Sequence, residues 1–260
     1  MAYSSIAKPT DYFNTNLYTG NSSTQAITGV GFQPDWVWIK DRSEVSFHEI
    51  FDAVRGVTKT MSSNSQNAES TESATLTAFG TDGFTLGSNG DVNYSGSNLV
   101  AWNWLGANGT ASNSDGSITS TVSANTTAGF SIVSYTGTQS AATIGHGLGA
   151  VPGMLIIKNR SSTDDRDWVV YHKNLSGNNK YLSLNSSSAE LTDAATFNNT
   201  APTSAVFSSA SSVEVNESSK TFIAYCFTEI KGYSKFGSYT GNGNADGTFV
   251  HTGFKPAFII

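Results

Sequence analysis

The sequence has a single cysteine, Cys226, few charged residues and no long apolar run. One cysteine cannot form an intrachain disulfide, which excludes a small disulfide-stapled secreted scaffold. No apolar run approaches the roughly 20 residues that a transmembrane helix needs, and residues 1–13 lack the apolar core of a signal peptide. We therefore predict a protein that does not insert into membranes.

Positive charge is also scarce. Fourteen Lys and Arg residues stand against twenty Asp and Glu residues, which gives a formal net charge of −6. No stretch gathers Lys or Arg as nucleic-acid binding would require. Nucleic acid is therefore not an expected partner.

Helix-forming residues are sparse, whereas Ser, Thr, Asn and Gly dominate, and 12% of the residues are aromatic. Short runs of aromatic and β-branched residues between polar turns are typical of an all-β protein. Residues 35–40 read as a strand that is buried on both faces, and residues 79–87 read as a hairpin. Only residues 44–59 favour a short helix, and Gly56 weakens it.

A motif of Tyr-Thr-Gly, a Gly-rich turn, a proline and an apolar strand occurs three times, starting at Tyr18, Tyr135 and Tyr239. The first two copies correspond far beyond the motif, because Asn93 and residues 100–104 match Asn216 and residues 223–227. An internal repeat of this kind predicts tandem copies of one fold.

We therefore predict tandem β-sandwich domains of the jelly-roll type. The expected division is an N-terminal segment (1–9), a first unit (10–105), a linker or long loop (106–126), a second unit (127–230) and the start of an incomplete third unit (231–260). We favour truncation of a longer protein as the reason for the incomplete unit. Otherwise its strands would complete a sheet of the second unit or of a neighbouring subunit.

The tryptophans of the first unit match other bulky side chains in the second. Positions that accept any large apolar group fill volume, whereas a platform for stacking sugars would need a flat ring each time. We therefore predict that these positions belong to the structural core: Trp36, Trp38, Trp102 and Trp104, with their counterparts Met154, Ile156, Tyr225 and Phe227.

The densest charge lies in residues 40–55, and it supplies weak ligand-binding candidates: Lys40, Arg42, His48, Asp52 and Arg55. His48 aligns with Trp168 and Asp52 with His172, so most of this set is absent from the second unit. Only the basic residues at positions 40 and 42 recur, as Lys158 and Arg160. We interpret the set as structural or solvated charge.

An enzyme that cuts polysaccharides would need two facing carboxylates about 5–10 Å apart. The candidates are Glu44, Glu49, Asp52 and Glu69, of which only Glu69 has an acidic counterpart, Glu190. No nucleophile elbow of the Gly-x-Ser-x-Gly type occurs. We therefore predict a non-enzymatic protein without catalytic residues.

The four histidines, His48, His146, His172 and His251, lack metal-binding spacing. We predict no metal site and no cofactor. Calcium remains an alternative, because it takes oxygens from turns. The turn residues concerned are Asn89, Asp91, Asn93, Asn198, Asn199, Asn242, Asn244 and Asp246, and turn propensity explains them equally well.

Several segments together resemble a domain that recurs in structural proteins of marine tailed phages. They are Asp11-Tyr12-Phe13-Asn14-Thr15, Gly31-Phe32-Gln33-Pro34-Asp35-Trp36-Val37-Trp38-Ile39-Lys40-Asp41-Arg42, Ile50-Phe51-Asp52-Ala53-Val54-Arg55-Gly56, Asp82-Gly83-Phe84 and Val100-Ala101-Trp102-Asn103-Trp104. The resemblance implies a concanavalin-like jelly roll and no established catalytic residues. The second unit departs from it by lacking the Phe-Asp-Ala-Val-Arg-Gly segment.

The resemblance implies a virion protein, assembled in the host cytoplasm, that serves as a tail fibre or surface appendage. It would attach to the host through many weak contacts with a surface glycan or protein, which add up through effective concentration. Its partners would include other virion proteins, and we expect a homo-oligomer such as a trimer. The alternatives are a capsid decoration or spacer protein and a polysaccharide-degrading enzyme.

Overall fold

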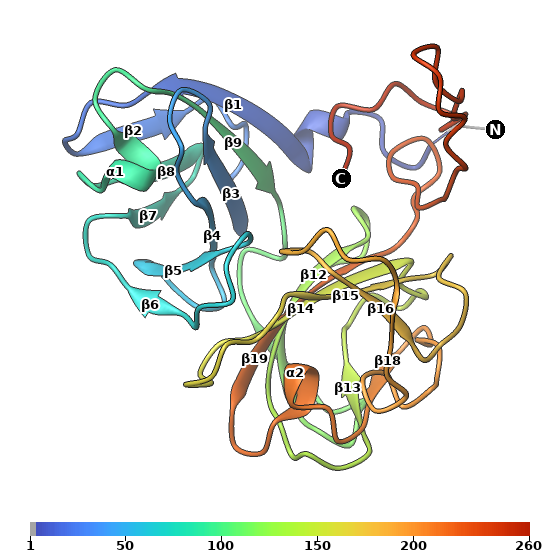
Figure 1. The fold of residues 1–260 in the computed structure, drawn as a ribbon. Coiled ribbons are helices and arrows are strands. Elements are labelled where there is room, and N and C mark those ends of the chain that lie inside the picture. The colour runs from blue at the N-terminus through green and yellow to red at the C-terminus, as the bar shows by residue number, and fades with distance from the viewer. Residues whose placement is uncertain (1–3) are drawn as a thin grey trace.

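The computed structural model describes residues 4–260 and consists almost entirely of antiparallel sheets, which confirms the predicted all-β class. Residues 1–3 of the expected N-terminal segment lie outside the described residues. Figure 1 shows two lobes in contact, with the first unit above and the second unit below.

The first unit contains a six-stranded sheet of order β1-β9-β3-β4-β5-β6 and a three-stranded sheet of order β2-β8-β7. Its elements are η1 (Pro9–Asp11), β1 (Phe13–Thr19), β2 (Gln25–Thr28), β3 (Trp36–Asp41), β4 (His48–Asp52), β5 (Lys59–Ser62), β6 (Ser70–Thr71), β7 (Leu76–Gly80), β8 (Gly83–Leu86), α1 (Gly90–Asn93) and β9 (Asn98–Trp104). Apolar side chains of both sheets pack between them, as in a β-sandwich.

The second unit repeats this plan with an eight-stranded sheet of order β10-β11-β12-β19-β14-β15-β16-β17 and a two-stranded sheet, β13-β18. Its elements are β10 (Ala111–Asn113), β11 (Ser120–Asn125), β12 (Phe130–Thr136), β13 (Ala142–Gly145), β14 (Met154–Asn159), β15 (Val169–His172), β16 (Lys180–Ser183), β17 (Leu191–Thr192), β18 (Val206–Ser209), α2 (Val213–Asn216) and β19 (Thr221–Phe227). A separate apolar cluster packs against these sheets, in a sandwich-like arrangement.

Strand register supports the residue correspondence between the units. Trp36 lies opposite Trp104 in the β3–β9 pair, and their counterparts Met154 and Phe227 lie opposite each other in the β14–β19 pair. Strands β12, β19, β14 and β15 of the second unit therefore take the places of β1, β9, β3 and β4 in the first.

Local sequence explains the regular elements. The apolar run of β3 is buried on both faces, as its composition predicts. The predicted hairpin is β7–β8, and it turns at Gly83, which has a φ of +146°. A Cβ atom there would lie only 1.9 Å from the carbonyl oxygen of Ile27, so only glycine fits this turn.

The helix predicted within residues 44–59 does not form, because this segment contains β4 and the start of β5. Ile50 and Phe51 are fully buried on opposite faces of β4, and this strand pairs with both β3 and β5. Gly56, with a φ of +91°, then ends the turn that follows. Tertiary burial thus overrides a weak local helix preference.

Two segments that were predicted to lie outside the two full units contribute to the packing. Residues 106–126, expected as a linker or long loop, form β10 and β11, and β11 pairs with the edge of β12. Residues 231–260 contain no named strand, yet Phe258 packs against Trp102 and Trp104 of the first unit, with ring centroids 5.5 and 5.3 Å apart.

Candidate functional site

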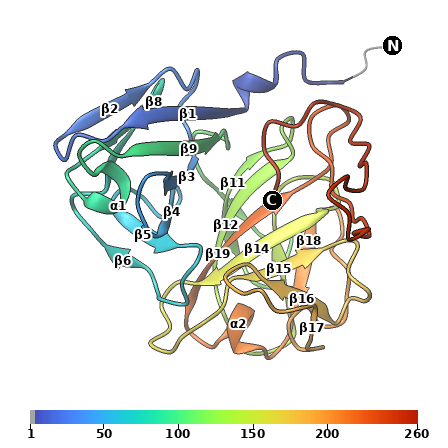
Figure 2. The same cartoon turned by 45° about the horizontal axis from the view of Figure 1, so that its top comes forward.

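The large sheets of the two units face each other through equivalent outer surfaces, as Figure 2 shows. A third apolar cluster joins them, and it contains Trp36, Trp38 and Trp104 together with Met154, Ile156 and Tyr225. Trp36 is central, because its ring stacks on Tyr225 with centroids 4.5 Å apart. The predicted core positions thus lie between the two sandwiches, and Trp102 and Phe227 are partly buried at the margin.

A buried polar network continues this interface. The hydroxyl of Tyr225 donates to Asp52 at 2.7 Å, and Asp52 forms an ion pair with Arg55. Arg55 also contacts Glu69, which accepts two hydrogen bonds from Arg160 of the second unit. Burial alone would lower the pKa of Arg55, but the nearby carboxylates raise it above the ordinary value and keep the guanidinium charged. Two of the weak ligand candidates, Asp52 and Arg55, therefore hold the units together.

The other three candidates lie around the loop between β3 and β4. The ammonium of Lys40 donates to the carbonyl oxygens of Glu44 and Ser46, and so it shapes this loop. Arg42 is exposed, and its backbone N–H donates to the carbonyl of Asn98. His48 is half-buried, and burial followed by the charge of Lys40 lowers its pKa. The five candidates do not converge on one point.

The four carboxylates considered for acid–base chemistry are also dispersed. Glu49 is buried and accepts hydrogen bonds from Thr60 and Ser62, and burial raises its pKa. Asp52 and Glu69 belong to the network between the units. Glu44 is exposed and lines a cavity between the β3–β4 loop and α1.

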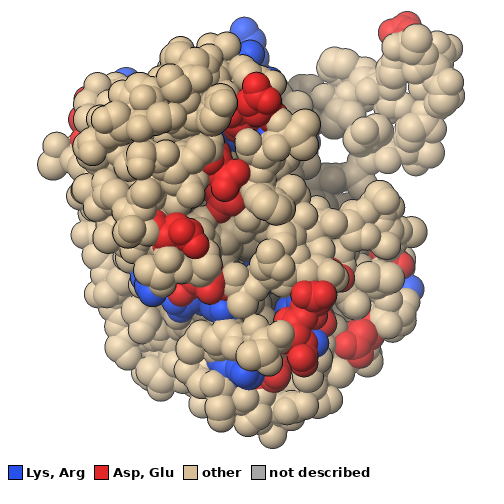
Figure 3. Space-filling model, turned by 60° about the vertical axis from the view of Figure 1, so that its left-hand side comes forward, with Lys and Arg blue, Asp and Glu red and all other residues tan. Residues whose placement is uncertain are grey.

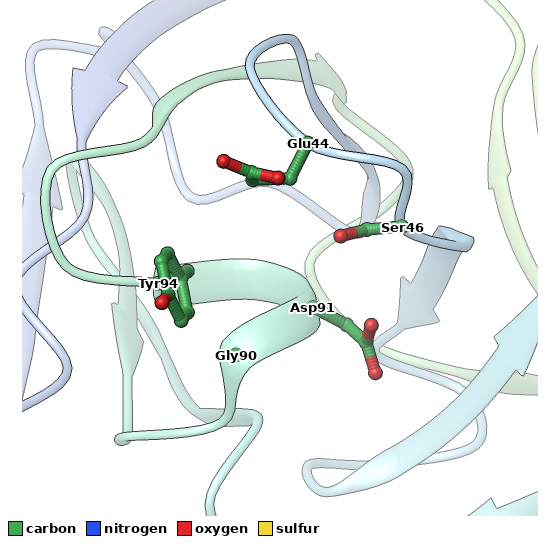
Figure 4. A pocket seen from close by; sticks show the side chains of 5 residues that line it. All are labelled: Glu44, Ser46, Gly90, Asp91 and Tyr94. Atoms are coloured by element: carbon green, nitrogen blue, oxygen red, sulfur yellow. The ribbon is translucent and has the colours of Figure 1, made fainter.

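This cavity has a volume of about 420 Å³ and is lined by Glu44, Ser46, Gly90, Asp91 and Tyr94. Figure 4 shows the β3–β4 loop with Glu44 and Ser46 on one side and α1 with the other three residues on the opposite side. Tyr94 is 54% exposed, which leaves its ring available to a ligand. The sequence had singled out Glu44 and Asp91 for other roles and had given no sign of Ser46, Gly90 or Tyr94.

The wall formed by α1 is fixed by hydrogen bonds. The side chain of Asn89 accepts from the N–H of Asp91 and so caps the helix. The amide of Asn93 donates to the carbonyls of Ser23 and Gly87, and the hydroxyl of Tyr18 donates to that of Val92. The cavity is therefore bounded on one side by α1, which these hydrogen bonds hold in place, and on the other side by the β3–β4 loop.

The lining is acidic. Glu44 and Asp91 carry negative charge, and the cavity contains no lysine or arginine among its lining residues. In Figure 3, acidic side chains in the upper part of the molecule, where the first unit lies, stand with few basic neighbours, whereas red and blue alternate in the lower part. A cationic or hydroxyl-rich group is the complementary ligand for such a surface.

The turn residues considered for calcium stabilise the turns in which they lie. Asn242 and Asn244 accept hydrogen bonds from the N–H groups of Asn244 and Asp246, and Asn198 and Asn199 adopt positive φ in a turn. Residues 4–260 contain no group of three or more His, Cys, Asp or Glu side chains placed to hold a metal ion. In the same range, no helix is long and apolar enough to cross a membrane.

Together these features define an all-β, sandwich-like protein with a shallow acidic cavity. The chain belongs to the family DUF7483, described as a domain of unknown function, and the match covers residues 8–260. No curated protein and no solved structure matches the chain. The description of the family names no role, so the resemblance to phage structural proteins remains a prediction.

Proposed function

We propose that the chain is a non-enzymatic structural and binding protein of a phage virion surface, built from tandem concanavalin-like jelly rolls. The observation that carries the structural role is the interface between the units, where an apolar cluster and a buried ion network join two sandwiches into one body. A fibre or appendage needs such stiffness, because it must hold its binding loops away from the particle.

The binding role rests on the exposed loops. The cavity beside Tyr94 is shallow and polar, as is usual for weak surface contacts rather than for an enclosed catalytic pocket. Weak single contacts become effective attachment when several copies act together. Homo-oligomerisation, a trimer in the simplest case, would supply these copies, and other virion proteins would anchor them.

A decoration or spacer protein is the second candidate. The observation in its favour is that the equivalent loop of the second unit differs, because Arg166 there forms ion pairs with Glu214 and Glu217. A spacer needs shape alone and would tolerate such divergence. A polysaccharide-degrading enzyme is less well supported, because Glu49, Asp52 and Glu69 are all engaged by protein donors.

Electron microscopy of the intact particle tests the proposal. We expect the protein at a distal tail position, with the β3–β4 loop facing outward. Location on the capsid shell would favour the decoration role, and burial among other subunits would contradict attachment. Assembly of the isolated chain, measured by light scattering, separately tests the expected oligomer.

A further inference from the structure

The β3–β4 loop of the first unit has an equivalent in the second, the loop between β14 and β15. Asp41 accepts hydrogen bonds from the N–H groups of Ser43 and Glu44, just as Asn159 accepts from those of Ser161 and Ser162. The loop is two residues shorter in the first unit, counted from Asp41 to His48 and from Asn159 to Trp168.

A lysine contact that occurs in both units establishes the correspondence at the other end of the loop. The ammonium of Lys40 donates to the carbonyl oxygen of Ser46 at 3.2 Å. In the second unit, the ammonium of Lys158 donates to the carbonyl oxygen of Arg166. Ser46 therefore occupies the position of Arg166.

In the second unit this position carries a positively charged side chain, that of Arg166. Its guanidinium lies 3.3 Å from Glu217 and 3.0 Å from Asp164, and 4.0 Å from Glu214. Asn159 also donates to Glu217, at 2.9 Å. The arginine thus links the loop to α2 and offsets part of the negative charge around it.

In the first unit two acids remain, one of the three is replaced by a tyrosine, and the arginine is gone. Asp91 stands at the place of Glu214, Tyr94 at that of Glu217, and Glu44 comes from the loop, as Asp164 does. With serine in place of arginine, the space is the 420 Å³ cavity of Figure 4. In that view the carboxylates of Glu44 and Asp91 lie on different sides of the opening.

A second observation points to a missing cation. Asp41 is 1% exposed, and its Oδ2 atom has no hydrogen-bond partner in residues 4–260. The equivalent atom in the second unit is the amide nitrogen of Asn159, which reaches Val213 and Glu217. Their counterparts are the cavity residues Gly90 and Tyr94. A buried carboxylate oxygen without a donor is costly. Its correspondence with the amide of Asn159 directs it toward Gly90 and Tyr94, although Asp41 is not itself among the residues that line the cavity.

We propose that the cavity of the first unit binds a guanidinium group from outside the chain, namely an arginine side chain of a protein partner. The ligand would donate to Glu44 and Asp91 and stack its planar cation on the ring of Tyr94. The inference rests on the proposed binding role but not on the location of the protein in a virion.

The test is a titration of the isotope-labelled chain by nuclear magnetic resonance. The probes are N-acetyl-arginine amide, its neutral isostere N-acetyl-citrulline amide, N-acetyl-lysine amide and glucosamine. We expect saturable shifts of the backbone amides of Ser46, Gly90, Asp91 and Tyr94 with the arginine probe. The dissociation constant should be on the order of 1–10 mM, and binding should weaken as salt is added.

Variants of the cavity make the expectation specific. Asp91→Asn and Glu44→Gln should each weaken binding of the arginine probe at least about fivefold, whereas Glu72→Gln, which removes an exposed carboxylate elsewhere, should not change it. Ser46→Arg should abolish binding, because it recreates the internal cation of the second unit.

The proposal would be overturned by equal shifts with the citrulline probe, by stronger binding of glucosamine than of the arginine probe, or by binding that survives both Asp91→Asn and Ser46→Arg. The absence of any saturable shift would also overturn it. That result would leave the structural role intact, since the location of the protein in the particle is measured separately.

Discussion

Arg160 of the second unit forms a bidentate ion pair with Glu69 of the first, with N–O distances of 2.9 and 3.0 Å. Arg55 approaches the same carboxylate at 3.2 Å, so one acidic side chain joins cations from both units. Because Glu69 is mostly shielded from water, its loss would leave two positive charges close together without their shared partner.

We therefore expect Glu69→Gln to lower the free energy of unfolding by roughly 3 kcal/mol. Urea denaturation followed by circular dichroism measures the change. Glu72→Gln, at an exposed position three residues away, is the control and should be nearly neutral. A variant at position 69 as stable as the wild type would mean that the interface does not depend on this ion pair.

Trp36 joins the apolar parts of the two units, because it contacts Trp38 and Trp104 within its own sheet and Phe130 and Tyr225 in the other. We expect the wild-type protein to unfold in a single transition. Trp36→Ala should cost about 3–5 kcal/mol and separate the transitions of the two units.

Guanidinium denaturation, followed by circular dichroism, tests this expectation. Leu17→Ala is the matched control, because Leu17 is 66% exposed and its truncation should change stability little. Two resolved transitions in the wild-type protein would show that the units fold independently, despite the shared cluster.

Local sequence signals predicted the strands and the hairpin because those features depend on neighbouring residues. The interface could not be predicted in this way. The run of β3 is apolar on both faces, so its pattern does not distinguish a face that packs inside one sandwich from a face that packs on another. The partner that decides the matter, Tyr225, lies far along the chain from Trp36.

The candidate cavity could not be predicted from the sequence either. Its signal is a serine, Ser46, where the second unit has Arg166, in a loop that differs in length by two residues. The alignment of His48 with Trp168 places Ser46 opposite Arg166, but it does not show which side chains surround that position in each unit. The contacts of Lys40 and Lys158 with the two carbonyls establish the correspondence.

The repeated asparagines show why part of the repeat motif recurs. Asn93 accepts from the N–H of Asn21 and donates to two carbonyls, and Asn216 does the same with Thr138, Ser140 and Ala210. Each fixes the turn after Tyr-Thr-Gly to the short helix of its unit.

Asn93→Ala and Asn216→Ala should each destabilise the protein by about 3–5 kcal/mol, since several buried groups lose their partners. Thermal unfolding compares the two variants with Asn67→Ala, at an exposed position. Asn93→Asp separates shape from hydrogen bonding: it retains the acceptor but places an oxygen against two carbonyls, and it should be no better than alanine. A harmless Asn93→Asp variant would contradict this account.

Lys158 links stability to pH. Its ammonium is buried and donates to the carbonyl of Gln66 in the first unit, and burial lowers its pKa to about 8. In the unfolded chain a lysine titrates near 10.4. Between about pH 8 and 10, the unfolded chain therefore holds more protons at this site than the native protein does, and the contribution of Lys158 to the free energy of unfolding rises with pH.

Below about pH 8 both states carry the proton, so this contribution should be constant there. We expect the free energy of unfolding of the wild type, relative to that of Lys158→Met, to increase between about pH 7.5 and 9.5, as measured by urea denaturation at several pH values. Lys255→Met removes one exposed positive charge and serves as the control. Parallel pH profiles for the wild type and Lys158→Met would show that the buried ammonium keeps its proton, because its hydrogen bonds to carbonyl oxygens would then outweigh the cost of burial.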